Sequence, residues 1–348
     1  MSSSDDLSTK QIESLKRFYK EEFSLQEALQ IIGSEDFSNR EWGFLGLNGH
    51  FDRNFSFRTP TILEKFIKET IPRSIYVGAV YSAPPDHDRG ISIHQVDWVR
   101  RELIFDIDLT EYDEVRPCDC RGKNQLCERC WELVKTAAFW IQDTLVNDFG
   151  VREELIHWVF SGRRGIHAWV TEKSFSELDN EQRTAIIDYL SLIRGAGSEA
   201  KLAEELINFP RNLGIRVTTH IIMPFFREAS KKTLERLGIS SERALFILQQ
   251  RNSMGIDQIF LERFVYADRM LKQKGITDYY PTREEIQEKV VLQWAPRIDS
   301  GVSKDIRRIL RLPGSVHGET GKRVQRLDFE ALSYFSPLDE NSIFEDGK

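Results

Sequence analysis

Two aspartates interrupt an apolar stretch of the chain. Residues 103–105 are apolar, Asp106 follows them, and Ile107 separates it from Asp108. Successive side chains of a β-strand point to opposite faces, so both carboxylates would lie on one face of a strand. Carboxylates this close repel each other, and divalent cations can neutralise them. A strand end that emerges into water is the commoner origin of so short a pattern, but the apolar residues before Asp106 favour a divalent-metal site for phosphoryl transfer.

A second candidate site combines glycines with cationic side chains. Its residues are, in order, Ser161, Gly162, Arg163, Arg164, Gly165, Ile166 and His167. Glycine lets the backbone approach a ligand closely, and a guanidinium group can bind two phosphate oxygens at once. The apolar segments on either side predict two strands joined by a tight turn, either as a hairpin or as a strand-loop-strand unit. We therefore expect a triphosphate-binding turn, although a charged hairpin tip in solvent is common for Arg-Arg-Gly alone.

The four cysteines of the chain lie within 13 residues. They are Cys118, Cys120, Cys127 and Cys130. Four thiolates in a short loop suffice for a closed tetrahedral zinc site, in which no ligand position is left for a substrate. We expect such a structural site in the loop 116–131, and the same ligands would also permit an iron–sulfur cluster. Disulfides are disfavoured because the polar, acidic N-terminus predicts a protein that stays in the cytoplasm.

A third aspartate, Asp299, precedes a basic segment. Between residues 297 and 326 the chain has eight basic and three acidic residues, although its net charge is −7. Asp299 could complete a metal site, and the following arginines with His317 could bind nucleic-acid phosphates. An aspartate at a turn before a solvated amphipathic helix fits the spacing equally well, so the pattern alone does not decide between them.

The spacing of apolar residues predicts the elements that position these side chains. Helices are expected within the first 35 residues and over residues 134–149, 281–293 and 304–311. Strands are expected over residues 51–57, 74–81, 103–109, 157–160, 166–171 and 295–299. Residues 178–275 have a helical pattern almost throughout. We therefore expect an α+β protein with a catalytic core of residues 1–175 and 276–335, a helical inserted subdomain of residues 176–275 and a flexible tail of residues 336–348.

The composition narrows the class of protein. Of the 348 residues, 40% are hydrophobic and 30% are charged, which is typical of a folded enzyme and excludes fibrous and low-complexity proteins. No apolar run approaches the roughly 18 residues of a membrane span, so we expect no membrane-spanning segment. A net charge of −7 argues against binding nucleic acid through bulk charge, but it leaves room for a local basic cleft.

Six segments together resemble the catalytic small subunit of archaeal and eukaryotic DNA primase. In the order of the family they are residues 39–44, 75–82, 105–108, 161–170, 296–299 and 312–317. The resemblance implies a primase-type mixed β-sheet core with flanking helices, a zinc-binding loop and a largely helical inserted subdomain. It also implies a nucleotidyltransferase that synthesises short primers de novo on single-stranded DNA for replication.

The resemblance assigns roles to individual residues. It implies that Asp106, Asp108 and Asp299 are catalytic and hold Mg²⁺ or Mn²⁺, and that the four cysteines hold Zn²⁺. The residues that it implies for binding the nucleoside triphosphate are Arg53, Ser161, Arg163, Arg164, His167, Arg311 and His317. A basic residue of the eukaryotic enzymes falls on Ser74 here, beside Arg73. The bound cations would polarise the primer 3′-hydroxyl and stabilise the departing diphosphate.

The resemblance also implies partners. A large primase subunit with an iron–sulfur domain would form a heterodimer with this chain, and the substrates would be a single-stranded DNA template, a primer and nucleoside triphosphates. The chain would act in the primosome with the replication machinery, associated with the nucleoid in an archaeal cytoplasm. Two alternatives stay open: a primase-polymerase-like enzyme for repair or gap filling, and a zinc-bearing single-strand-binding subunit without catalysis. The zinc cluster and the helical insertion favour the primase.

Overall fold

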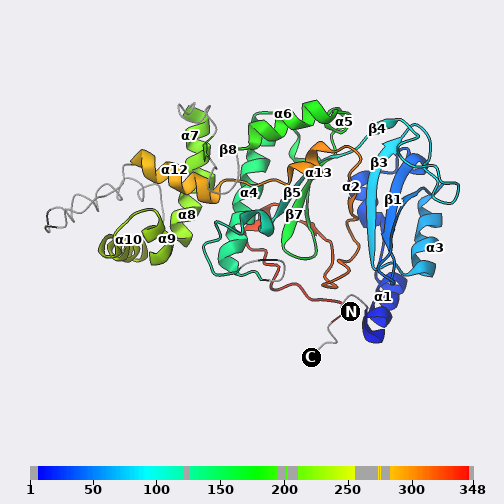
Figure 1. The fold of residues 1–348 in the computed structure, drawn as a ribbon, viewed down its shortest axis with the longest axis horizontal. Helices are drawn as coiled ribbons and strands as arrows, with labels where there is room; N and C mark the ends of the chain where they lie inside the picture. The colour runs from blue at the N-terminus through cyan, green and yellow to red at the C-terminus, as the bar shows by residue number, and fades with distance from the viewer. Residues whose placement is uncertain are drawn as a thin grey trace. The chain divides into compact units, whose positions relative to one another are not determined.

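The computed structural model divides the chain into two compact units (Figure 1). It describes residues 7–120, 122, 125–194, 201–202, 211–254, 273, 275 and 283–344. Unit 1 comprises Met1–Asp108, Leu145–Asp188 and Ile298–Lys348, and unit 2 comprises Leu109–Thr144 and Tyr189–Arg297. None of the described helices is long and apolar enough to cross a membrane. The expected limits of a catalytic core, a helical insertion and a tail stay a prediction.

The first sheet of unit 1 has five strands, and each described pairing in it is antiparallel. Its strand order is β10-β3-β1-β2, with β4 beside β3. The strands are β1 (Arg40–Leu45), β2 (Phe51–Phe55), β3 (Ser74–Tyr81), β4 (Trp98–Arg100) and β10 (Leu310–Arg311). Because β10 pairs with β3, Arg311 lies opposite Tyr76 although 235 positions of sequence separate the two residues. The C-terminal part of the chain is thereby built into the N-terminal sheet.

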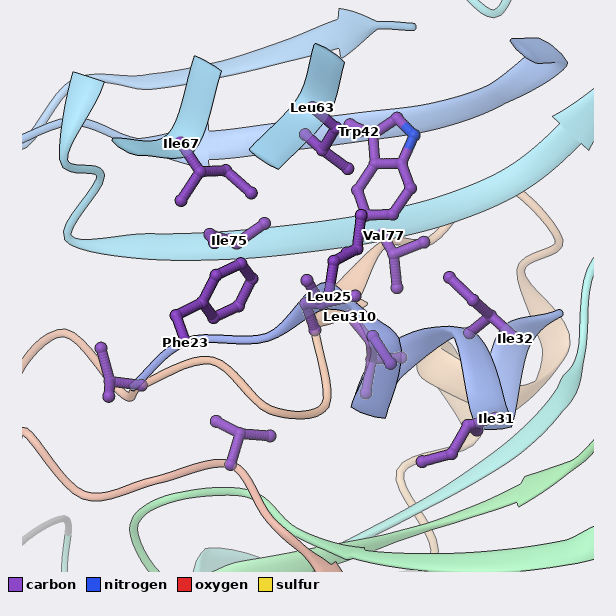
Figure 2. Close-up of a cluster of buried hydrophobic side chains, with 14 of the residues drawn as sticks. Phe23, Leu25, Ile31, Ile32, Trp42, Leu63, Ile67, Ile75, Val77 and Leu310 are labelled. Atoms are coloured by element: carbon purple, nitrogen blue, oxygen red, sulfur yellow. The ribbon is translucent and has the colours of Figure 1, made fainter. Parts of the chain in front are cut away.

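Three helices bury their apolar faces against this sheet. They are α1 (Thr9–Glu21), α2 (Leu25–Ile32) and α3 (Pro60–Thr70). Helix α1 begins at a capping box, in which Ser8 and Gln11 each accept a hydrogen bond from the other's backbone N–H. Figure 2 shows side chains of α2 and α3 gathered about the sheet residues Trp42 and Val77, which are nearly fully buried. Burial of such large apolar groups is the main stabilising contribution here.

The second sheet of unit 1 carries the two aspartates of the first sequence motif. Its order is β11-β6-β7-β5, again with antiparallel pairings among the described strands. The strands are β5 (Leu103–Asp108), β6 (Ile156–Phe160), β7 (Gly165–Val170) and β11 (Arg326–Leu327). Strands β6 and β7 form the hairpin predicted around residues 161–165. In the ladder between β5 and β7, Asp106 lies opposite His167 and Asp108 lies opposite Gly165.

Helices and short turns make up the rest of the described chain. The remaining helices are α4 (Glu128–Asn147), α5 (Lys173–Ser176), α6 (Asn180–Leu190), α7 (Arg211–Val217), α8 (Met223–Glu228), α9 (Lys231–Arg236), α10 (Ser241–Met254), α12 (Arg283–Trp294) and α13 (Ser300–Lys304). Strands β8 (Ile193–Arg194) and β9 (Lys201–Leu202) pair with each other. A π-helical turn spans Thr218–Ile222, and 3₁₀ turns span Phe37–Asn39, Leu109–Tyr112, Glu153–Leu155 and Glu330–Ser333. The α+β class is thus confirmed.

Two predicted elements are wrong. Residues 295–299 do not form a strand; instead the Asp299 side chain accepts a hydrogen bond from the N–H of Gly301 and caps α13. Residues 304–311 do not form one helix, because α13 ends at Lys304 and residues 310–311 are the strand β10. Leu310 is buried and pairs with Val77 of β3, so tertiary pairing overrides the local helical pattern there. Parts of the predicted helical region 178–275 lie outside the described residues.

Candidate functional site

The carboxylates of Asp106 and Asp108 lie on one face of β5, as the sequence predicts. Both residues are partly exposed. In contrast, Phe105, which precedes Asp106, and Ile107, which lies between the two aspartates, are fully buried. This alternation follows from the period of two residues along a strand. The apolar side chains anchor β5 in the core, and the pairing of β5 with β7 fixes the position of each carboxylate along the strand.

Asp299 joins the other two aspartates through the backbone. Its N–H donates a hydrogen bond of 2.9 Å to the carbonyl oxygen of Asp106. Its carboxylate accepts the hydrogen bond of 2.8 Å from Gly301 that caps α13. The fold therefore brings the three aspartates to one edge of β5. They do not form a compact ligand set, because among the described residues only the four cysteines have all their ligand atoms within 4.8 Å of one another.

Two buried arginines that sequence reasoning missed support this region: Arg101 contacts α13, and Arg183 donates to the carbonyl oxygens of Arg101 and Glu102, just before β5. Arg101 is 1% exposed and donates hydrogen bonds of 3.0 and 2.8 Å to the carbonyl oxygens of Val302 and Asp305. Burial, and next the charge of Arg183, lower the pKa of Arg101 to about 9. The signal that could have found it is an arginine two residues before an apolar strand, where a buried guanidinium must find acceptors.

The turn between β6 and β7 needs glycine at two positions. Gly162 has a φ of +84°, and a Cβ atom there would lie 2.6 Å from the Cβ of His317. A Cβ atom on Gly165 would lie 2.5 Å from the carbonyl oxygen of Ile107. The Ser161 hydroxyl accepts a hydrogen bond from the N–H of Gly165, which closes the turn. The glycines therefore allow the turn to pack closely against both β5 and the loop at His317.

Both arginines of this turn form ion pairs with acidic side chains. Arg164 Nε donates to Asp108 Oδ1 at 2.7 Å. Arg163 Nη1 lies 2.6 Å from Glu319 Oε2. The first pair joins the candidate phosphate-binding turn directly to the candidate metal site, and the second joins it to an acidic residue that the sequence analysis did not single out.

Arg311 reaches the same turn from the first sheet. Its Nη1 donates to the carbonyl oxygen of Ser161 at 3.1 Å, and its guanidinium lies 5.8 Å from the ring centroid of Tyr76. Its Nε is buried and has no hydrogen-bond partner among the described residues. A buried donor without a partner is costly, so Arg311 is held in this position by its other contacts.

Two neutral histidines face the arginines. Burial, and next the charge of Arg311, lower the pKa of His167 to about 3. Burial and then the charges of Arg311, Arg163 and Arg164 lower the pKa of His317 to about 2. The Nδ1 of His317 accepts a hydrogen bond from the N–H of Glu319, so a neutral ring carries its proton on Nε2. The three arginines thus converge about His317.

His167 lies between the arginines and the first aspartate. Its Nε2 is 3.5 Å from Asp106 Oδ1. Its Nδ1 is buried and lacks a hydrogen-bond partner within the described part of the chain. The neutral ring therefore lies beside the Asp106 carboxylate without adding a positive charge next to the arginines.

Arg53 is placed differently from the other residues expected to bind the triphosphate. Its Nε and Nη2 donate hydrogen bonds of 2.7 and 2.9 Å to the carboxylate of Glu41, which is fully buried. Its Nη2 also donates to the carbonyl oxygen of Arg307. This bidentate pair joins β1 to β2 and satisfies a buried charge. The structure therefore gives Arg53 a structural role, and its contact with a nucleotide stays a prediction.

Arg73 and Ser74 hold the loop that carries His317. Arg73 is buried and donates a hydrogen bond of 2.8 Å to the carbonyl oxygen of Gly318. The Ser74 hydroxyl accepts a hydrogen bond of 3.0 Å from the N–H of Gly318. Both residues position His317 from behind, a role that the sequence alone did not suggest.

The four cysteines form a compact set within unit 2. Their sulfur atoms all lie within 4.8 Å of one another, and Cys127 Sγ and Cys130 Sγ are 3.9 Å apart. A tetrahedral zinc ion with Zn–S bonds of about 2.3 Å requires sulfur atoms about 3.8 Å apart. The N–H of Cys127 donates to Cys130 Sγ, as suits a charged thiolate. The set can therefore hold a metal ion such as zinc.

Comparisons with known proteins identify relatives over most of the chain. The family model described as DNA primase small subunit matches residues 105–329, a stretch longer than half of the chain that includes every expected site residue except Arg53. A Schizosaccharomyces pombe protein named DNA primase small subunit is 27% identical over 94% of this chain and 75% of its own length. A Drosophila melanogaster protein of that name is 30% identical over 89% of this chain and 74% of its own length. An archaeal relative from Methanothrix thermoacetophila, named DNA primase small subunit PriS, is 28% identical over 88% of this chain and 81% of its own length.

Proposed function

Because the chain belongs to the DNA primase small subunit family, we propose that it is the catalytic subunit of a primase that synthesises short primers de novo on single-stranded DNA for replication. The observation that supports this most directly is that Arg164 pairs with Asp108 of β5, while Arg311 donates a hydrogen bond to Ser161 in the turn that also carries Arg163. Cationic groups for a polyphosphate and carboxylates for divalent cations lie in one site, as metal-dependent nucleotidyl transfer requires.

The three aspartates are the proposed ligands of the catalytic cations. Carboxylate oxygens suit Mg²⁺ and Mn²⁺, and β5 holds Asp106 and Asp108 on one face. When bound, the cations polarise the primer 3′-hydroxyl and neutralise charge on the departing diphosphate. Asp108 would hold a cation with a carboxylate that also pairs with Arg164, and Asp299 is joined to Asp106 through their backbone hydrogen bond. The Asp108 carboxylate therefore would link the metal site to Arg164 of the phosphate-binding turn.

The turn 161–165 and Arg311 are the proposed triphosphate-binding groups. Guanidinium groups bind phosphate oxygens through charge-assisted hydrogen bonds. His317 remains neutral and can donate from Nε2, and the Nδ1 of His167 points to no partner among the described residues. Neutral histidines can add hydrogen bonds without adding to the repulsion among the three arginines.

We assign the cysteine set to a structural zinc ion. The sulfur spacing fits a mononuclear tetrahedral site, in which all four ligand positions are filled by the protein. Elemental analysis of the purified chain should therefore find about one zinc per chain. Iron in place of zinc, or no metal at all, would contradict this assignment.

The proposed partners follow from the same function. A primase small subunit implies a large subunit, and the iron–sulfur domain expected there needs cysteines of its own, because the four cysteines of this chain are assigned to zinc. The proposed substrates are nucleoside triphosphates, a single-stranded DNA template and the growing primer. The core of residues 1–175 and 276–335 would carry out the chemistry.

Synthesis without a supplied primer tests the proposal. The chain, alone and with a candidate large subunit, is incubated with single-stranded DNA, nucleoside triphosphates and Mg²⁺ or Mn²⁺. We expect short products that disappear in Asp106→Asn and Asp108→Asn and persist in Asp97→Asn, which removes an exposed aspartate elsewhere in unit 1. A loss of at least about a hundredfold is expected, because each aspartate contributes to transition-state charge stabilisation.

The outcomes also separate the alternatives. Extension of supplied primers without synthesis de novo would indicate a repair or gap-filling polymerase. Single-strand binding without nucleotide incorporation, even with a proven partner, would indicate a non-catalytic subunit.

A further inference from the structure

The proposed triphosphate site contains an acidic side chain that the proposed mechanism does not use. Glu319 Oε2 lies 2.6 Å from Arg163 Nη1, while the side chain of Glu319 is 58% exposed and that of Arg163 is 15% exposed. Surface ion pairs of this kind usually have little effect on stability. This pair differs because its cationic partner belongs to a site built for an anion.

The fold holds the Glu319 turn against the phosphate-binding turn. The Thr320 hydroxyl donates a hydrogen bond of 2.6 Å to the carbonyl oxygen of Gly162, the residue before Arg163. The N–H of Glu319 donates to Nδ1 of His317. Hydrogen bonds thus hold the backbone on both sides of the ion pair, at Gly162 and at Glu319 and Thr320. These contacts place the Glu319 backbone beside Arg163.

The C-terminal segment secures this turn from its other side. The Ser342 hydroxyl donates to the carbonyl oxygen of Thr320, and the N–H of Ile343 donates to the carbonyl oxygen of Gly321. Because these contacts already order the backbone of the turn, the pairing of Glu319 with Arg163 costs only side-chain conformational entropy. Glu319 therefore competes with an anionic ligand for Arg163.

We propose that Glu319 is a positioning residue that holds Arg163 in the nucleotide-free site and is displaced by the triphosphate. This inference rests on the proposed function, because it concerns the same nucleotide site. Arg163 exchanges one anionic partner for another, so part of the binding free energy of the triphosphate is used to release Glu319. The carboxylate keeps Arg163 oriented and at the same time lowers the affinity for nucleotide.

The charges of the site determine the sign of the effect. Arg163, Arg164 and Arg311 act on His317, and two acidic residues, Glu319 and Asp108, pair with the first two of these arginines. Asp108 is needed for the metal, whereas Glu319 has no such role. Removal of the Glu319 charge should therefore strengthen the binding of any polyphosphate, with or without a divalent cation.

Binding of inorganic triphosphate tests this without catalysis. Calorimetry on the full chain, without divalent cations, should show that Glu319→Gln binds inorganic triphosphate about two- to fivefold more tightly than the wild type, the range of an exposed ion pair. Glu319→Lys should bind more tightly still. Glu330→Gln, which removes another exposed glutamate of the C-terminal region, is the matched control and should bind as the wild type does.

Steady-state kinetics provide the second measurement. In Glu319→Gln the KM for nucleoside triphosphate should fall about two- to fivefold while kcat changes less than about twofold. Glu319→Asp keeps the charge and should return KM toward the wild-type value. The melting temperature should stay near that of the wild type, because the side chain is mostly exposed.

Unchanged or weaker triphosphate binding in Glu319→Gln would overturn the proposal. A fall in affinity together with the melting temperature would likewise overturn it, because Glu319 would then be a structural tie. Failure of the proposed function is distinguishable: if no primer is made, the calorimetry still decides the role of Glu319. If primers are made and the triphosphate affinity is unchanged, only the role of Glu319 is wrong.

Discussion

At the scale of single residues, the site depends on keeping histidines neutral among arginines. His317 and His167 are nearly fully buried. Burial lowers the pKa of both imidazoles, and the positive charge of Arg311 lowers both pKa values further. An imidazolium in either place would repel the guanidinium groups that the triphosphate requires. Neutral rings instead supply hydrogen bonds whose direction is fixed by the backbone, as the contact from Glu319 to His317 illustrates.

This arrangement predicts how stability depends on pH. The folded-state pKa of His317 is about 2, far below the value of about 6.5 expected in the unfolded chain. The unfolded state therefore binds more protons at acidic pH. The contribution of the neutral His317 ring to stability is fully present above about pH 6.5 and is lost as the pH falls toward the folded-state pKa. Urea denaturation at pH 7.5 and pH 5 should show a loss smaller by about 1–2 kcal/mol in His317→Asn than in the wild type.

The matched control is His50→Asn, which removes an exposed imidazole. Equal loss of stability between the two pH values in the wild type and in His317→Asn would show that the ring does not titrate as described.

At the scale of elements, the strands that carry the site were predictable, whereas the segment around Asp299 was not. Strand β5 and the hairpin of β6 and β7 follow from local apolar patterns with aspartates or glycines at defined positions. The helix α13 begins at Ser300 because Asp299 caps it, and β10 exists because Leu310 pairs with β3. Neither cause is visible in local periodicity, since one is a single hydrogen bond and the other a contact distant in sequence.

Arg101 helps to hold α13 in position through two hydrogen bonds. Its hydrogen bonds to Val302 and Asp305 would be lost in Arg101→Met, which leaves the carbonyl group of the buried residue Val302 without this donor. Chemical denaturation should show a decrease of about 2–4 kcal/mol in the free energy of unfolding. Because α13 follows Asp299, the concentration of Mn²⁺ needed for half-maximal activity should also rise.

The adjacent Arg100 offers a control. It pairs with the exposed acids Glu35 and Asp36, so Arg100→Met should cost less than about 1 kcal/mol. Similar losses in the two variants, or an unchanged Mn²⁺ requirement in Arg101→Met, would mean that Arg101 does not support the site.

At the scale of the whole molecule, the site is assembled from segments that are far apart in sequence. The backbone N–H of Asp299 donates a hydrogen bond to the carbonyl oxygen of Asp106, and the Arg311 side chain donates one to the carbonyl oxygen of Ser161. The sequence motifs identified most of these residues by chemical type and by family resemblance, but spacing could not show which would meet. The ion pairs of Arg53 with Glu41 and of Arg163 with Glu319 illustrate the limit, because both depend on side-chain geometry in the finished fold.

The central claim is that Asp106, Asp108 and Asp299 together hold the catalytic cations. Titration of Mn²⁺ in the presence of nucleoside triphosphate, followed by electron paramagnetic resonance, measures this most directly. We predict tight binding of about two Mn²⁺ ions per chain, with at least about tenfold weaker binding in Asp106→Asn, Asp108→Asn and Asp299→Asn and no change in Asp97→Asn. Wild-type Mn²⁺ binding in any of the three single variants would contradict the assignment of that aspartate, and in all three would contradict the account.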